Sequence, residues 1–175
     1  MQPAICFTVC RVNCAGYPAR MTCIIRVLAT DASSHPDSSD IAATTALYQQ
    51  HVLHGTASFQ IDPPSIDDIE SRMMALFAKE YPVLIAERCD GVIVGYVYAG
   101  PQKPRSAYNQ TIEYSVYLDK ECLGKGIGRL LLTALINAAA APGFYQIMAV
   151  IGDSANTASI GLHSALGFRP VGAAQ

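Results

Sequence analysis

The sequence predicts one mixed α/β domain, and three observations support this class. Short apolar runs bounded by turn residues, which are typical of strands, alternate with longer stretches whose apolar residues recur at helical spacing. A glycine-rich turn over residues 124–128 joins one such strand to one such helix. The composition is that of a globular chain, since 51% of its 175 residues are hydrophobic and 15% are charged, and this length fits a single domain.

The first half of the chain contains one predicted strand and two predicted helices. An apolar run at residues 23–28 is typical of a buried strand. Apolar residues at helical spacing then occur between Ile41 and Val52, where Gly55 interrupts the pattern. Residues 56–62 are expected to be extended. Pro63-Pro64-Ser65 starts a second helix, whose apolar side is formed by Ile66, Ile69, Met73, Leu76 and Phe77.

The second half contains most of the predicted sheet. Strands are predicted at residues 83–87, 92–99, 111–118 and 147–151. A helix follows the glycine turn and ends at Pro142-Gly143, and a last helix covers residues 156–166. The predicted order is therefore β-α-α-β-β-β-α-β-α.

Charge and hydropathy exclude several classes of protein. The net charge is −2 and lysine and arginine form no run, whereas a nucleic-acid-binding protein usually has a basic stripe. No apolar stretch approaches the ~20 residues of a membrane-spanning helix. The first residues lack the basic start and long apolar centre of a secretory signal. We therefore expect a cytoplasmic protein with no nucleic-acid or membrane partner.

The chain is expected to divide into an N-terminal extension, residues 1–20, and one domain, residues 21–175. Four of the six cysteines lie in the first 23 residues, at positions 6, 10, 14 and 23. Zinc sites usually contain two closely spaced pairs of ligands, and Cys89 and Cys122 stand alone. No metal site is predicted, and the cysteines are expected to be unpaired thiols.

The glycine-rich turn is the most informative motif. Glycines allow positive φ angles and close approach of a ligand, and the free N–H groups at a helix start can bind phosphate oxygens. The predicted pyrophosphate site comprises Gly124, Lys125, Gly126, Ile127, Gly128 and Arg129. The G-x-G-x-G spacing differs from the dinucleotide fingerprint and from the P-loop. A tight turn without a ligand is the alternative at this point.

This turn resembles the R/Q-x-x-G-x-G/A coenzyme A loop of the GNAT superfamily of N-acetyltransferases, with Leu123 at the position of the usual Gln or Arg. From Ile25 to Val171 the chain is similar to the branch that acetylates phosphinothricin, methionine sulfone and methionine sulfoximine. The strings that carry this resemblance are His54-Gly55-Thr56-Ala57-Ser58-Phe59, Tyr96-Val97-Tyr98-Ala99-Gly100-Pro101, Arg105-Ser106-Ala107-Tyr108, Glu113-Tyr114-Ser115-Val116-Tyr117, Ala149-Val150-Ile151-Gly152 and Leu162-His163-Ser164-Ala165-Leu166-Gly167-Phe168.

The resemblance implies a GNAT fold, a mixed and mostly antiparallel sheet flanked by helices, with acetyl-CoA as cosubstrate. The backbone of Val116, Tyr117 and Leu118 would pair with the pantetheine arm like an added strand, and one of its N–H groups would bind the oxyanion. Asn156 and Ser159 match the family spacing at the start of the last helix. They are expected to cap this helix, and Asn156 also to contact coenzyme A.

Two residues are expected to be catalytic. Glu113 matches the general base of the family, which removes a proton from the amine directly or through water. His163 stands where many relatives have a tyrosine beside the sulfur, and it could protonate the departing thiolate. The alternatives are a solvent-facing carboxylate for Glu113 and a structural histidine for His163.

The acceptor is expected to be a small amino-acid-like amine. Lys103, Arg105 and Tyr108 lie in the loop before Glu113, and an arginine fork suits a carboxylate. Phe59 is a candidate wall of the acceptor pocket. The alternatives are a solvated loop and a core phenylalanine.

Relatives of this branch continue for about two more strands after the last predicted helix, so C-terminal strands are expected to be missing here. An uncovered sheet edge favours association, and a homodimer is expected. The main alternative function is a non-catalytic acetyl-CoA-binding or dimerisation module, and thioester hydrolysis is a minor one. Acetylation of a polyamine or a protein N-terminus is a further alternative.

Overall fold

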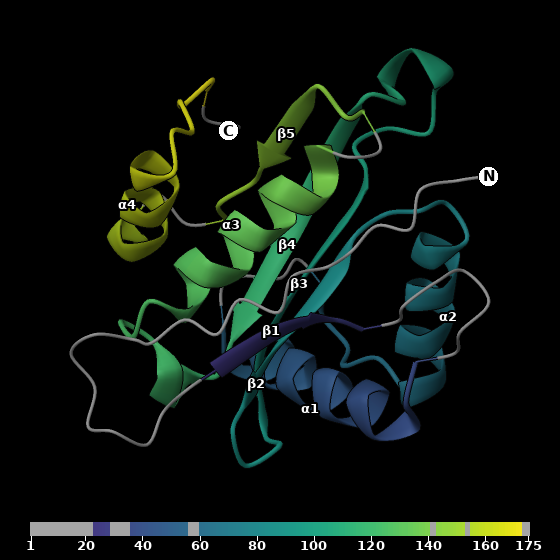
Figure 1. Cartoon of the computed structure of the whole chain (residues 1–175), viewed down its shortest axis with the longest axis vertical. Coiled ribbons are helices and arrows are strands. Elements are labelled where there is room, and N and C mark those ends of the chain that lie inside the picture. Colours follow the sequence, from purple (N-terminus) through teal and green to yellow (C-terminus); the bar gives the residue numbers. More distant parts are fainter. Residues whose placement is uncertain (1–22, 29–35, 56–59, 141–142, 153–154, 173–175) are drawn as a thin grey trace.

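The computed structural model of the chain describes residues 23–28, 36–55, 60–140, 143–152 and 155–172. Four helices and five strands follow one another in the predicted order (Figure 1). The strands are β1 (Cys23–Val27), β2 (Val83–Arg88), β3 (Ile93–Pro101), β4 (Thr111–Leu118) and β5 (Gln146–Ala149). The helices are α1 (Ser38–His54), α2 (Ile66–Phe77), α3 (Ile127–Ala140) and α4 (Thr157–Ala165).

The five strands form one sheet in the order β1-β2-β3-β4-β5. Neighbouring strands are antiparallel except β4 and β5, which are parallel. The predicted mixed, mostly antiparallel sheet is thus confirmed. Two details of the prediction are wrong: Val150 and Ile151 lie outside β5, and residues 60–62 form no strand. Residues 1–20, the expected extension, and residues 56–59 lie outside the described part of the chain.

Helices cover both faces of the sheet and bury two cores. On one face, α1 and α2 pack on side chains that include Ile85, Tyr96 and Tyr117. On the other face, α3 packs on side chains that include Val97 and Tyr114 (Figure 1). Because side chains alternate along a strand, successive residues of β4 face different helices.

The two helices of the first face begin at side-chain caps. Ser65 and Asp68 form a capping box at α2, in which Ser65 Oγ accepts from the Asp68 amide at 3.1 Å and Asp68 Oδ2 accepts from the Ser65 amide at 2.9 Å. The prediction that Pro63-Pro64-Ser65 starts a helix is therefore confirmed. At α1, Asp37 Oδ1 accepts from the Ser39 amide at 2.8 Å.

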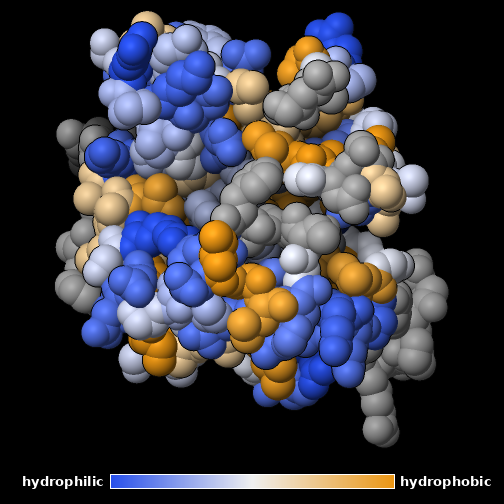
Figure 2. Space-filling view, turned by 180° about the vertical axis from the view of Figure 1, so that it is seen from behind, coloured by the Kyte–Doolittle hydropathy of each residue, from blue (hydrophilic) through white to orange (hydrophobic). Residues whose placement is uncertain are grey.

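Most of the large apolar side chains are buried, but some reach the surface. Ile61, Tyr145 and Val171 are the most exposed of the described ones. Seen from behind, apolar side chains form several groups separated by polar ones (Figure 2). No helix in the described ranges is long and apolar enough to cross a membrane.

An ion-pair network fixes β1 to its neighbours. The guanidinium of Arg26 donates to both carboxylate oxygens of Asp40 at 2.7 Å and to Glu87 Oε2 at 2.6 Å. Asp40, in the first turn of α1, is only 6% exposed. The network therefore joins β1, α1 and β2.

Replacing Asp40 with alanine is expected to lower the free energy of unfolding, because it leaves the Arg26 charge without its bidentate partner. We expect a loss of roughly 2 kcal/mol, below the ~3–5 kcal/mol of fully buried pairs, because Arg26 is in contact with water. Urea unfolding of the variant measures this. Asp90→Ala, which removes an exposed partner of Arg88, is the control and should cost well under ~1 kcal/mol. Equal losses in the two variants would contradict the prediction.

Candidate active site

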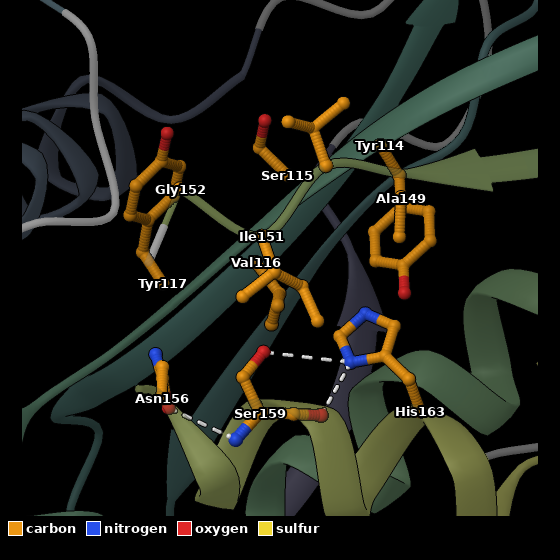
Figure 3. Close-up of a pocket in the computed structure, with 11 residues that line it drawn as sticks. Tyr114, Ser115, Val116, Tyr117, Ala149, Ile151, Gly152, Asn156, Ser159 and His163 are labelled. Carbon is orange, nitrogen blue, oxygen red and sulfur yellow. Dashed lines mark hydrogen bonds between the residues drawn. The ribbon is translucent and has the colours of Figure 1, made fainter. Parts of the chain in front are cut away.

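The site lies where β4 and β5 separate. The two strands pair from Thr111 and Gln146 only as far as Tyr114 and Ala149. β4 continues to Leu118, whereas the chain leaves β5 at residue 150. A cleft opens between the diverging segments, and the start of α4 closes one side of it (Figure 3). Its lining comprises Tyr114, Ser115, Val116, Tyr117, Ala149, Val150, Ile151, Gly152, Asn156, Ser159 and His163.

Beyond the last paired residue, the backbone of β4 is bonded to a described strand on one side only. Residues 115–118 pair with β3, and no described strand lies against their other edge. Val116 and Tyr117, two of the predicted pantetheine-binding residues, line the cleft here. Leu118 does not, and its carbonyl oxygen accepts a hydrogen bond from His51 Nε2 of α1 at 2.8 Å. This edge can therefore accept an extended ligand as an additional strand.

The glycine turn lies beyond the end of β4, outside the lining of the cleft. Gly124 and Gly126 have φ angles of +70° and +78°, a backbone conformation that other residues adopt only with strain. The amide of Leu130 makes the first hydrogen bond of α3, to the Gly126 carbonyl at 3.1 Å. The N–H groups of residues 127–129 precede this bond and point out of the helix start. The predicted phosphate-binding geometry is therefore available.

Gly128, in the first turn of α3, lets that helix approach β4 and α4. A Cβ atom at this position would lie 3.2 Å from side-chain atoms of both Leu118 and Leu162. Lys125 is partly buried and Arg129 is exposed. Leu123, at the position of the family's Gln or Arg, is 58% exposed, so the turn provides backbone donors and two cations.

Asn156 and Ser159 lie at the start of α4, as predicted. Asn156 is the N-cap, and its Oδ1 accepts from the Ser159 amide at 3.0 Å. The expected capping role is thereby confirmed for Asn156, whereas Ser159 supplies the capped N–H group and not a second cap. Both residues also line the cleft.

His163 projects from α4 toward β4 (Figure 3). It is 7% exposed, and its Nδ1 lies 2.6 Å from the Ser159 carbonyl oxygen. Because a carbonyl only accepts, Nδ1 carries a proton and Nε2 is the atom left for a ligand. The ring stacks on Tyr114, with centroids 5.8 Å apart and planes 15° apart, and meets Phe168 edge-on.

Glu113 lies near the point where β4 and β5 separate, on the face of the sheet opposite to His163. It lies one residue before the end of the β4–β5 pairing and is partly exposed. Its carboxylate has no hydrogen-bond or ion-pair partner among the described residues. It shares its side of β4 with Tyr117, in the core beneath α1 and α2, whereas Tyr114 and the stacked His163 lie on the α3 face. The two candidate catalytic residues thus stand on either side of the sheet.

Three of the predicted acceptor-binding residues, Lys103, Arg105 and Tyr108, lie outside the lining of the cleft. Lys103 and Arg105 are exposed in the loop between β3 and β4, and Tyr108 is partly buried there. Lys103 Nζ lies 5.1 Å from the centre of the Tyr108 ring. Phe59 lies outside the described residues.

Sequence reasoning missed part of the lining. Ser115 and the segment 149–152 were present in the strings that carried the resemblance, but no role was assigned to them. Tyr114 was missed because an aromatic residue in an alternating strand pattern is typical of a core position. Burial raises the pKa of Tyr114 well above its usual value, and burial has the same effect on Tyr117.

Comparisons with known proteins agree with this geometry. A family model described as "Acetyltransferase (GNAT) family" matches residues 44–168. A phosphinothricin N-acetyltransferase of Alcaligenes faecalis is 43% identical over 154 residues, which cover 88% of this chain and 74% of the relative. An L-methionine sulfoximine/L-methionine sulfone acetyltransferase of Salmonella typhimurium is 39% identical over 135 residues, 75% of this chain and 76% of the relative.

Among solved structures, a GNAT superfamily phosphinothricin acetyltransferase from Sinorhizobium meliloti in complex with AcCoA superposes with a TM-score of 0.76. The two chains are 36% identical, and the match covers 84% of this chain and 75% of the other. The resemblance inferred from the separated strings is thus confirmed by family model, relatives and fold together. The chain belongs to the acetyltransferase (GNAT) family.

Proposed function

We propose that this chain transfers the acetyl group of acetyl-CoA to the amine of a small amino-acid-like acceptor, of the phosphinothricin, methionine sulfone or methionine sulfoximine type. The names of its relatives support this substrate class. The observation that carries the proposal is the edge of β4 at residues 115–118, which pairs with no described strand and lies beside the first turn of α3.

The residues of the cleft fit acetyl-CoA. Backbone groups of Val116, Tyr117 and Leu118 pair with the amides of the pantetheine arm. The N–H groups of the glycine turn, with Lys125 and Arg129, bind the pyrophosphate. Asn156 contacts the arm from the start of α4. Acetyl-CoA supplies an activated acetyl thioester.

Glu113 and His163 act from opposite faces of the sheet, at the point where β4 and β5 separate. Glu113 takes a proton from the acceptor ammonium, directly or through one water, on the α1 and α2 face. A backbone N–H within residues 116–118 binds the developing oxyanion. On the other face, protonated His163 gives the Nε2 proton to the departing sulfur, while the Ser159 carbonyl holds its Nδ1–H. Amine and sulfur are thereby kept on opposite sides of the reacting carbon.

The loop between β3 and β4 supplies the acceptor contacts. Arg105 and Lys103 bind the acceptor carboxylate, with Tyr108 and Phe59 beside its side chain. Both cations are exposed and neither has a carboxylate partner in the described ranges. They are therefore available to an anionic ligand.

We also propose a cytoplasmic homodimer. Support for association comes from β5, whose outer edge pairs with no described strand, and from the nearby Tyr145, which is 82% exposed. Light scattering on the purified protein tests the dimer, and a monomeric mass at working concentration would contradict it.

Thiol release from acetyl-CoA tests the proposed function directly. The amines are phosphinothricin, methionine sulfone, methionine sulfoximine, spermidine and a short peptide. We expect release with at least one of the first three, because the loop cations match a carboxylate and repel a polyamine. Release with spermidine or the peptide alone would refute the proposed acceptor class. If no amine caused thiol release although the protein bound acetyl-CoA, a non-catalytic module would be favoured.

A further inference from the structure

Two buried tyrosine hydroxyls have no hydrogen-bond partner in the described part of the chain. They belong to Tyr96 and Tyr114. A buried polar group without a partner is rare and costs stability. Each of them therefore needs an explanation.

The two tyrosines differ in what surrounds them. Tyr96 is fully buried on β3 under α1 and α2, where its ring stacks on Tyr98 and Tyr117. Tyr114 is 5% exposed and lines the cleft. Figure 3 shows its ring and that of His163 side by side at the end of the cleft. Of the two hydroxyls, only that of Tyr114 therefore lies at the proposed reaction site.

Tyr114 is suited to donate a hydrogen bond and unsuited to give up its proton. Burial raises its pKa, so the phenol keeps its proton while the thiolate of coenzyme A forms beside it. His163, whose Nδ1 is held by Ser159, presents Nε2 on the same face. The cleft thus contains His163, which can transfer a proton, and Tyr114, which can donate a hydrogen bond but keeps its proton.

We propose that the Tyr114 hydroxyl is a catalytic hydrogen-bond donor to the sulfur of coenzyme A, a role that rests on the proposed function. As the amine nitrogen, already deprotonated once by Glu113, bonds to the acetyl carbon, it releases its second proton to water. The carbon–sulfur bond breaks and its electron pair goes to the sulfur. Tyr114 Oη donates to this thiolate and keeps its proton, and His163 Nε2 delivers the proton that forms the thiol. The hydroxyl has no partner among the residues that the structure describes because the sulfur is its partner.

Tyr114→Phe and Tyr96→Phe are a matched pair that tests this role. Both remove a buried hydroxyl without a partner, so both are expected to raise the melting temperature or leave it unchanged. Only Tyr114→Phe is expected to lower kcat, by about 10- to 100-fold, the size of a hydrogen bond to a charged group. The Kd of acetyl-CoA should stay within about threefold of wild type in both. A kcat within twofold of wild type in Tyr114→Phe, or equal losses in the two variants, would overturn the proposal.

A second measurement needs no acceptor. The ionisation of coenzyme A bound to the protein is followed by thiolate absorbance, with desulfo-coenzyme A as the reference. The acid dissociation constant of the bound thiol should be about tenfold or more larger in wild type and in Tyr96→Phe than in Tyr114→Phe. Equal ionisation in all three proteins would overturn the proposal. If no amine is acetylated, the proposed function fails, while this titration still decides the role of Tyr114.

Discussion

Replacing Glu113 with glutamine is expected to lower kcat with the preferred acceptor by about 100-fold or more, the usual effect of losing a general base. The side chain keeps its size and loses only its charge and basicity. Because Glu113 is not among the residues that line the cleft, the Kd of acetyl-CoA should not change. Steady-state kinetics and calorimetry with acetyl-CoA measure the two quantities.

The pH dependence distinguishes a base from a structural carboxylate. Above the pKa of the acceptor amine, the free amine is already neutral and does not need a base to deprotonate it, so the deficit of Glu113→Gln should shrink at high pH. A structural defect would persist at every pH. Glu70→Gln, on α2 and away from the split, is the matched control and should leave kcat unchanged. A Glu113→Gln enzyme of wild-type activity would exclude Glu113 as the base.

The elements of this fold could be predicted because their signals are local. The apolar run of β1, the capping residues of α2 and the positive-φ glycines before α3 each act over a few residues, and the structure contains all three. Their order predicted a mixed α/β domain, and the family resemblance predicted a mostly antiparallel sheet flanked by helices. Of the residues to which the family strings assigned a role, Val116, Tyr117, Asn156, Ser159 and His163 line the cleft.

The end of β5 could not be predicted in this way. Val150 and Ile151 continue the apolar run of Gln146–Ala149 and have the same strand propensity. They leave the sheet because β4 and β5 diverge, which is a property of the packed structure. The same divergence converts the two residues from strand to cleft wall.

The assignment of side chains to faces also required the structure. Glu113 and Tyr114 are neighbours in the sequence, and alternation alone places them on different sides of β4 without saying which side holds the ligand. The packing of Tyr114 beneath α3 and α4, and of Tyr117 beneath α1, settles the two faces. A buried hydroxyl without a partner leaves no trace in the sequence at all.

Replacing Gly126 with alanine is expected to raise the KM for acetyl-CoA by about tenfold or more. The φ angle of +78° costs a residue with a Cβ roughly 1–2 kcal/mol, so the turn relaxes and its N–H groups no longer converge on the phosphates. No atom lies within 4 Å of a Cβ at this position, so the effect comes from backbone strain and not from a clash. Initial rates at varied acetyl-CoA concentration measure it.

Gly91→Ala is the control that distinguishes the effect of backbone strain on stability from an effect on acetyl-CoA binding. Gly91 lies in the turn between β2 and β3 with a φ angle of +84°, and a Cβ there also has open space. The two variants should therefore lose similar stability, whereas only Gly126→Ala should bind acetyl-CoA poorly. The acceptor KM should stay unchanged in both, because the turn lies beyond the cleft and away from the loop that holds Lys103 and Arg105. An unchanged KM for acetyl-CoA in Gly126→Ala would mean that the glycine turn is a tight connection and not the phosphate site.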